Sequence, residues 1–196
     1  MPERPDQRIS ISAALGRFRE SSAARRRVEI QRDQRAAVLV PVIDDGGPVR
    51  LLLTRRSQDL PTHQGQVAFP GGFLLEPAED PVHAALREAE EEIGLPAATV
   101  EILGLLDDAL THTGLVSVTP VVGRISGLPA LVPAPSEVAR IFTIPVAELL
   151  QPERWRPRGP TVEFEHEGEV LWGLSARIVL RLLELASLGS PIGIPG

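Results

Sequence analysis

The segment between Asp80 and Pro96 carries the start and stop signals of a single helix, and it constrains the fold more than any other part of the sequence. Asp80 is a good N-cap residue, and Pro81 suits the first helical position. Gly94 can adopt the left-handed conformation that ends a helix, and Pro96 prevents continuation. Apolar residues recur every three or four positions, as a buried helix face requires. They are Val82, Leu86, Ala89 and Ile93.

The opposite side of this helix gathers carboxylates. At about 100° per residue, Glu88, Glu91 and Glu92 fall within one arc of roughly 100°, whereas Glu90 points away and is expected to be solvated. Like charges on one face repel by a few tenths of a kcal/mol per pair, and a hard divalent cation reverses that sign. Because Mg²⁺ and Mn²⁺ prefer carboxylate oxygens, the sequence predicts a metal site on this face.

The hydrophobic pattern elsewhere predicts an α/β fold, an α/β/α sandwich with a mixed central sheet. The Gly-rich segment over residues 69–72 is expected to turn sharply ahead of the acidic helix, and residues 129–135 to form a loop. Helices are expected over residues 9–35 and 174–188, with a short helical turn over residues 146–150. Strands are expected over residues 36–43, 49–54, 66–69, 100–106, 115–125, 138–144, 161–164 and 169–172.

Length and composition narrow the class of protein. A chain of 196 residues suits one domain, here over residues 36–188, with a helical segment over residues 1–35 packed on it and a tail over residues 189–196. The absence of cysteine excludes disulfides and a cysteine nucleophile. No apolar run is long enough for a membrane span or a signal peptide, so we expect a cytoplasmic protein without a membrane partner. A net charge of −6 and few aromatic residues argue against a nucleic-acid partner.

The acidic helix and the loop before it resemble the Nudix box, G-x5-E-x7-R-E-U-x-E-E-x-G-U, in which U is a bulky apolar residue. Two positions depart from this pattern. Ala89 is small for the U position, and Gly72 stands one residue too far from Glu79, so the loop is one residue longer. The matching positions are Glu79, Arg87, Glu88, Glu91, Glu92, Gly94 and Leu95.

The resemblance implies roles for several positions of the box. It adds the Gly72 carbonyl to the three carboxylates as a metal ligand. Arg87 and Glu79 are expected to form a salt bridge that orients the helix, with a direct phosphate contact by Arg87 as the alternative. The general base is left open between Glu91 and Glu137, an acid from a later loop. The candidate catalytic residues are therefore Glu79, Arg87, Glu91 and Glu137.

The stretch before the box narrows the family. Residues 52–72 resemble the signature L-L-T-x-R-S-x3-R-x3-G-x3-F-P-G-G of coenzyme A pyrophosphatases, although the second arginine is Pro61 here. The resemblance implies hydrolysis of the pyrophosphate bond of coenzyme A to 3′,5′-ADP and 4′-phosphopantetheine, with Mg²⁺ or Mn²⁺. Arg55 and Arg56 point to opposite faces of a strand, and the signature favours Arg56 for holding a phosphate. The candidate substrate-binding residues are Arg55, Arg56, His63, Gly65, Phe69 and Gly71.

Two other functions stay open. A Nudix pyrophosphatase for another nucleoside diphosphate derivative, such as ADP-ribose, is compatible with Pro61 in place of the signature arginine. A non-catalytic Nudix domain that senses a nucleotide would be favoured by the loss of a box carboxylate, yet all three are present. His63 and His112 lie near the signature loops and can act as acid or base or as loop hydrogen-bonding residues. The sequence does not indicate the oligomeric state.

Overall fold

The structure is a computed structural model that describes residues 13, 14, 27, 34–76 and 78–186. Most of the predicted helix over residues 9–35, and the whole tail over residues 189–196, lie outside the described residues. Among the few described residues before the first strand, Ala14 is fully buried and belongs to the larger of two core clusters.

The main sheet is built around β1 (Arg35–Ile43), a nearly continuous apolar strand. β1 pairs in parallel with β7 along its whole length, and the other strand pairs are antiparallel, so the sheet is mixed as predicted. The order of the path is β3-β2-β1-β7-β5, with β4 on β1, β6 on β7 and β8 on β2. The remaining strands are β2 (Arg50–Arg56), β3 (Val67–Ala68), β4 (Gly71–Phe73), β5 (Glu101–Leu105), β6 (Ala109–Leu110), β7 (Ser117–Ile125) and β8 (Val138–Pro145).

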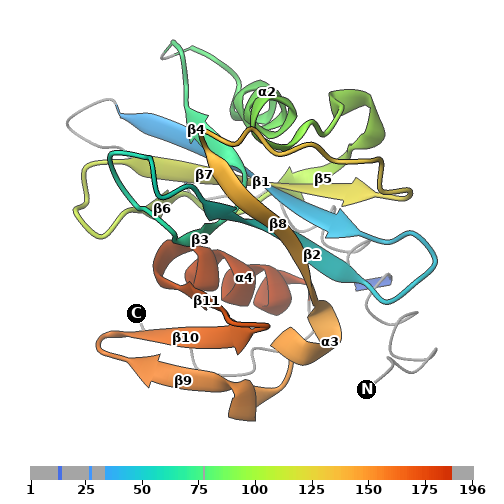
Figure 1. The fold of residues 1–196 in the computed structure, drawn as a ribbon, viewed down its shortest axis with the longest axis vertical. Helices are drawn as coiled ribbons and strands as arrows, with labels where there is room; N and C mark the ends of the chain where they lie inside the picture. The colour runs from blue at the N-terminus through green and yellow to red at the C-terminus, as the bar shows by residue number, and fades with distance from the viewer. Residues whose placement is uncertain (1–12, 15–26, 28–33, 77, 187–196) are drawn as a thin grey trace.

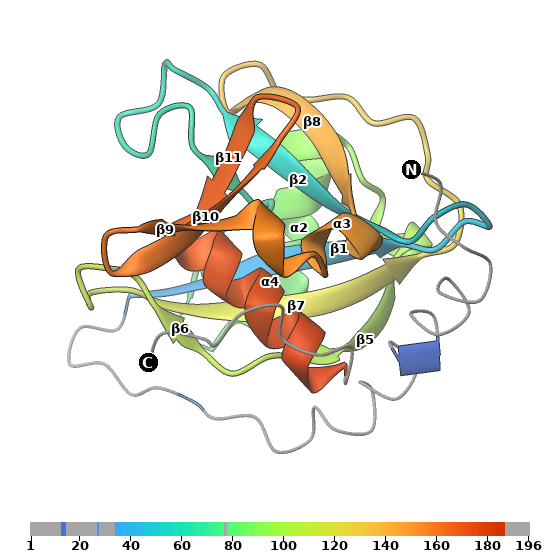
Figure 2. The same cartoon turned by 90° about the horizontal axis from the view of Figure 1, so that it is seen from below.

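Two helices cover the main sheet from opposite sides, as Figures 1 and 2 show. Helix α2 (Pro81–Ile93) buries its apolar face with Leu39 and Leu52, and α4 (Gly173–Leu185) packs in the other cluster with Val40 and Leu53. Neighbouring residues of one strand thus belong to different clusters, because side chains alternate between the faces of a sheet. This confirms the predicted α/β/α sandwich. The shorter helices are η2 (Ala97–Thr99), α3 (Val146–Leu149) and η3 (Pro152–Arg154).

The strand directions bring the ends of β2 and β4 and the start of β8 to the same end of the main sheet. β2 and β4 both run antiparallel to β1, and β8 runs antiparallel to β2. Arg56 at the end of β2, Phe73 at the end of β4 and Val138 at the start of β8 therefore lie at this end, which Figure 1 shows beside α2.

The predicted sharp turn ahead of the acidic helix is present, because β3 and β4 run in opposite directions with a bend at Pro70. The glycine pair itself, however, is part of a strand. Gly71 and Gly72 belong to β4 and pair with β1. A Cβ atom on Gly71 would lie 2.3 Å from the carbonyl oxygen of Ala37 and 2.6 Å from the Cα atom of Val38. Glycine is needed here because two backbones approach closely, which the sequence pattern alone does not distinguish from a turn.

A second, three-stranded sheet packs near α4 and was not predicted as a separate unit. It consists of β9 (Trp155–Arg158), β10 (Thr161–His166) and β11 (Glu169–Trp172). The predicted hairpin is present as β10 and β11, but β9 was missed because only Trp155 in it is buried and Pro157 weakens its strand signal. The two-residue strand β6 was missed as well.

Candidate active site

The local sequence fixes helix α2 as predicted. The Asp80 side chain accepts a hydrogen bond of 2.8 Å from the backbone N–H of Val82, and Pro81 occupies the first turn. Gly94 ends the helix with a φ of 65°. The helix C-terminus is also tied to the loop after Leu128, since the backbone N–H groups of Val132 and Ala134 donate to the last turn. These bonds fix both ends of the element that carries the carboxylates.

The three carboxylates share one side of α2 but differ sharply in burial. The Glu88 side chain is 16% exposed and the Glu91 side chain is 60% exposed, whereas Glu92 as a residue is only 4% exposed. Glu92 lies at the edge of the arc, about 60° from buried Ala89, so the packed face covers it. The helix periodicity therefore groups Glu92 with the other two carboxylates but does not predict its burial. Glu90 is exposed, as predicted.

Buried Glu92 is the electrostatic centre of the site. Burial raises the pKa of Glu92 from 4.5 to about 7, and the negative charges of Glu137 and Glu88 act in the same direction. The backbone N–H of Gly71, 3.3 Å from Oε2, and the positive charge of Arg56 oppose this rise. Glu137, which precedes β8, is thus close enough to Glu92 for their charges to interact. Four charged side chains from α2, β2 and the loop before β8 therefore lie close enough to interact electrostatically. They are Glu88, Glu92, Arg56 and Glu137.

Arg87 binds both its predicted partner and two of the carboxylates. Its Nε lies 3.5 Å from Glu79 Oε1, and its Nη1 lies 2.7 Å from Glu88 Oε1 and 3.4 Å from Glu91 Oε2. Its Nη2 donates to the carbonyl oxygen of Phe73 at 3.3 Å. The predicted ion pair with Glu79 is therefore present, and the same guanidinium also holds the end of β4 against the carboxylates.

Gly72 lies directly against the carboxylate of Glu88. A Cβ atom on Gly72 would lie 2.5 Å from the Glu88 Cδ atom and 2.6 Å from both of its oxygens. Among the described residues, no three His, Asp or Glu side chains converge on one cation position. The donors still suit Mg²⁺ or Mn²⁺, because every candidate is a hard carboxylate or carbonyl oxygen and Gly72 leaves the space that a side chain would fill.

We expect Gly72→Ala to weaken activation by metal. The added methyl group displaces the Glu88 carboxylate, so the half-saturating metal concentration should rise about 10-fold, as for other changes beside metal ligands. Metal titrations of the hydrolysis rate measure this. Gly127→Ala is the matched control, because a Cβ atom there has no neighbour within 4 Å. Equal responses of the two variants would contradict the role of Gly72.

Arg55 and Arg56 point to opposite faces of the sheet, as predicted. Arg56 lies on the α2 side, where its charge acts on Glu92, and its buried Nε has no hydrogen-bond partner among the described residues. Arg55 lies on the other side and donates to Glu169 at 3.1 Å, which also accepts from Arg140 at 2.9 Å. No sequence motif predicts this cluster, because its members come from strands far apart in the chain.

The other predicted substrate-binding residues have local structural roles. His63 and Gly65 adopt positive φ angles of 57° and 63° in the loop between β2 and β3, and His63 Nδ1 lies 3.0 Å from Gln66 Oε1. Phe69 is only 4% exposed and lies in the core, so its predicted contact with substrate is not supported. Phe69 thus has a packing role in this structure. His112 lies on an exposed loop, and no contact joins it to the carboxylates of the site among the described residues.

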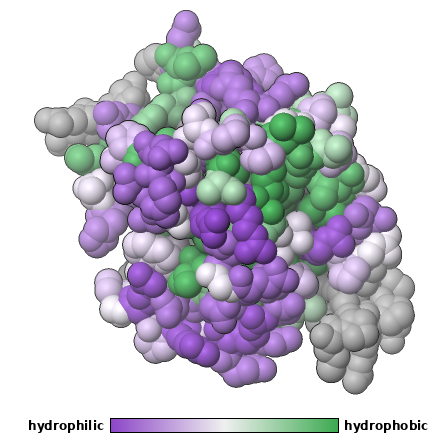
Figure 3. All heavy atoms as spheres, viewed as in Figure 1, coloured by the Kyte–Doolittle hydropathy of each residue, from purple (hydrophilic) through white to green (hydrophobic). Residues whose placement is uncertain are grey.

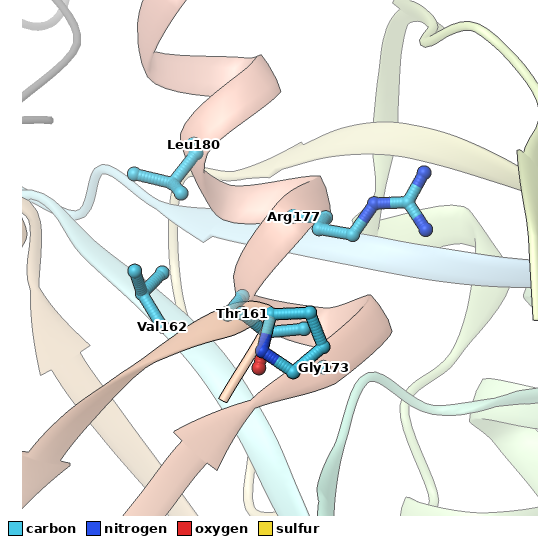
Figure 4. A pocket seen from close by; sticks show the side chains of 7 residues that line it. Thr161, Val162, Gly173, Arg177 and Leu180 are labelled. Carbon is cyan, nitrogen blue, oxygen red and sulfur yellow. The ribbon is translucent and has the colours of Figure 1, made fainter. Parts of the chain in front are cut away.

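A shallow pocket lies on the other side of the molecule from these carboxylates. Figure 4 shows it between the start of β10 and helix α4, where Val162 and Leu180 form an apolar wall beside Arg177. None of its lining residues belongs to the predicted site, so we assign the chemistry to the end of the sheet beside α2.

Within the described residues, no helix is long and apolar enough to cross a membrane.

Comparisons with known proteins agree with this geometry. A sequence model of the NUDIX domain matches residues 33–163. The uncharacterized Nudix hydrolase NudL of Pectobacterium atrosepticum is 39% identical over 161 residues, covering 78% of this chain and 83% of that protein. NudL of Photorhabdus laumondii is 37% identical over 184 residues, covering 90% and 97%. The crystal structure of a Nudix hydrolase from M. smegmatis, RenU, aligns with a TM-score of 0.51 at 23% identity, covering 62% and 76%.

The chain therefore belongs to the Nudix hydrolase family. Nudix hydrolases generally use divalent metal ions and act on small nucleotide derivatives. The likeness to RenU supports the fold alone at that level of identity.

Proposed function

We propose that this Nudix hydrolase cleaves the pyrophosphate bond of coenzyme A and its derivatives to 3′,5′-ADP and 4′-phosphopantetheine, with Mg²⁺ or Mn²⁺. The observation that carries the proposal is the placement of Arg56, the arginine that the coenzyme A signature favours. β2 ends at Arg56 and brings its charge to the carboxylate side of the sheet, next to Glu92. The same signature leads directly into Gly72, which packs on Glu88.

The residues of the site divide the work of hydrolysis. Glu88, Glu91, Glu92 and the Gly72 carbonyl would hold the metal ion, which neutralises phosphate charge and lowers the pKa of bound water. The Arg56 guanidinium binds a phosphate oxygen and stabilises the charge that grows on the diphosphate. Water then attacks one phosphorus, and the bond from that phosphorus to the bridging oxygen breaks.

A carboxylate must accept the proton of the attacking water. Glu91 is 60% exposed and reachable by water, and Glu137 lies near Glu92 from the loop before β8. Both fit the role of base, and Arg87 acts on the reaction by positioning Glu88 and Glu91. Figure 3, in the view of Figure 1, shows polar surface over much of this face with apolar surface beside it.

A second candidate function is favoured by Pro61, which stands where the signature has its second arginine. Loss of that cation removes one contact for a substrate phosphate. A nucleoside diphosphate derivative with fewer phosphates than coenzyme A, such as ADP-ribose, then becomes the competing substrate.

A substrate panel separates the two candidates. With Mg²⁺ or Mn²⁺ present, we expect coenzyme A or an acyl or disulfide derivative to give the highest kcat/KM, and mass spectrometry to find 3′,5′-ADP and 4′-phosphopantetheine. A chelator should abolish turnover, because the carboxylates alone cannot neutralise the diphosphate. If ADP-ribose is hydrolysed 100-fold more efficiently than coenzyme A, the substrate assignment is wrong. Full activity in the chelator would contradict the metal requirement.

A further inference from the structure

Two large apolar side chains are exposed immediately beside the candidate site. Phe73, the last residue of β4, is 57% exposed, and Leu75 in the following segment is 74% exposed. Leu74 between them turns inward and packs on the core cluster beneath α2. Single exposed apolar residues are common, but two on one short segment next to a catalytic helix need an explanation.

The exposure of these side chains does not come from a loose backbone. The carbonyl oxygen of Phe73 accepts a hydrogen bond from Arg87 Nη2 at 3.3 Å, and the backbone N–H of Leu75 donates to Glu79 Oε2 at 2.6 Å. Arg87 and Glu79 are themselves an ion pair. The residues that orient the acidic helix thus also hold this segment with its apolar side chains outward, so the apolar surface and the carboxylates are fixed relative to each other.

The position of Phe73 suits contact with a ligand that extends beyond the charged centre. Phe73 directly follows Gly72, and one guanidinium bonds both its carbonyl and the Glu88 carboxylate. Gly72 faces α2, so the Phe73 side chain leaves the end of the strand on the opposite face, while its backbone stays bonded to the guanidinium that binds the Glu88 carboxylate. Arg56 lies at the same end of the sheet. A charged region therefore borders an apolar one, as a ligand with a diphosphate and an uncharged arm requires.

We propose that Phe73 and Leu75 bind the uncharged arm that extends from the diphosphate of the substrate. This inference rests on the proposed function, in which that arm is the pantetheine chain, and it adds the residues that recognise it. Contact with the methyl and methylene groups of the arm removes the exposed ring and the leucine side chain from water, which favours binding. These residues set substrate preference and take no part in the chemical step.

The test compares the two halves of the substrate on one variant. We expect the double variant Phe73→Ala/Leu75→Ala to raise KM for coenzyme A about 10-fold, or about 1.4 kcal/mol, with kcat within 2-fold of the parent. The inhibition constant of 4′-phosphopantetheine should rise by a similar factor, whereas that of 3′,5′-ADP should stay within 2-fold. The control is Val132→Ala, which truncates a side chain that is 70% exposed but follows the other end of α2.

The outcomes separate this inference from the proposed function. If the parent protein does not hydrolyse coenzyme A, the proposed function fails before any variant is compared. If it does, and the double variant keeps the parent values of KM and both inhibition constants, only the role of Phe73 and Leu75 fails. Equal weakening of both product halves also overturns it. The inference also fails if the parent is a dimer in size-exclusion chromatography and the double variant is a monomer. That result would show that Phe73 and Leu75 join two copies of the chain.

Discussion

Glu92→Gln is expected to lower kcat by about 10²-fold or more while stabilising the metal-free protein at pH 8. The loss of activity follows because glutamine keeps the shape of the side chain but removes the charge that a divalent ion and the developing transition state require. Steady-state rates at saturating metal measure it. Glu91→Gln should lose activity on a similar scale, since it removes a charge from the same arc.

The stability effect distinguishes the two variants, because only Glu92 is buried. Its pKa rises from 4.5 in the unfolded chain to about 7 in the folded protein, chiefly through burial. The proton on Glu92 therefore favours the folded state below pH 4.5, and this contribution is lost as the pH rises through 7. Above pH 7 the folded protein holds a buried charge at a cost of about 3 kcal/mol, at about 1.4 kcal/mol per pH unit.

Urea unfolding in a chelator tests this sign. Glu92→Gln should raise the free energy of unfolding by about 1–3 kcal/mol at pH 8 and by less than about 1 kcal/mol at pH 5. Glu91→Gln should show no such pH-dependent gain, because the Glu91 side chain is 60% exposed. A Glu92→Gln protein that is less stable than the parent at pH 8 would show that the carboxylate is well compensated in the metal-free protein.

Most of the fold could be predicted because the helix caps and the hydrophobic pattern of the sequence match the helices, strands and buried faces of the structure. The caps at Asp80 and Gly94 fix α2 to the residue, and the Val-rich run of β1 reads as a buried strand without knowledge of its partners. What could not be predicted depends on contacts between distant segments. Gly71 looks like a turn residue until the backbone of β1 is beside it, and Pro157 hides β9 until β10 pairs with it.

The same limit applies to the site. The periodicity of α2 correctly groups Glu88, Glu91 and Glu92, because helix geometry alone sets their directions. The periodicity does not predict that Glu92 is buried, because the residues that bury it come from β4 and from the segment leading to Glu137, which are distant in the sequence. The Arg55–Glu169–Arg140 cluster has no local signal at all, because its members come from three strands.

Arg87→Ala should damage both stability and activity, whereas Glu90→Ala should do little to either. Arg87 contacts Glu79, Glu88 and Glu91 and is itself only 25% exposed, so its removal leaves partly buried carboxylates uncompensated. We expect a loss of about 1–3 kcal/mol in the free energy of unfolding. We also expect a fall of about 10- to 100-fold in kcat, because groups that orient metal ligands act on that scale.

The comparison with Glu90 separates geometry from general charge. Glu90 is three residues from Arg87 on the same helix, yet it is exposed and off the arc, so Glu90→Ala should change stability by under about 0.5 kcal/mol. Thermal melts and steady-state rates on both variants decide the matter. Arg87→Lys adds a further arm, because a single ammonium group cannot serve Glu79, Glu88 and the Phe73 carbonyl together. Full activity of Arg87→Lys would show that charge alone suffices, and an inactive Glu90→Ala would contradict the assignment of the three carboxylates to the metal.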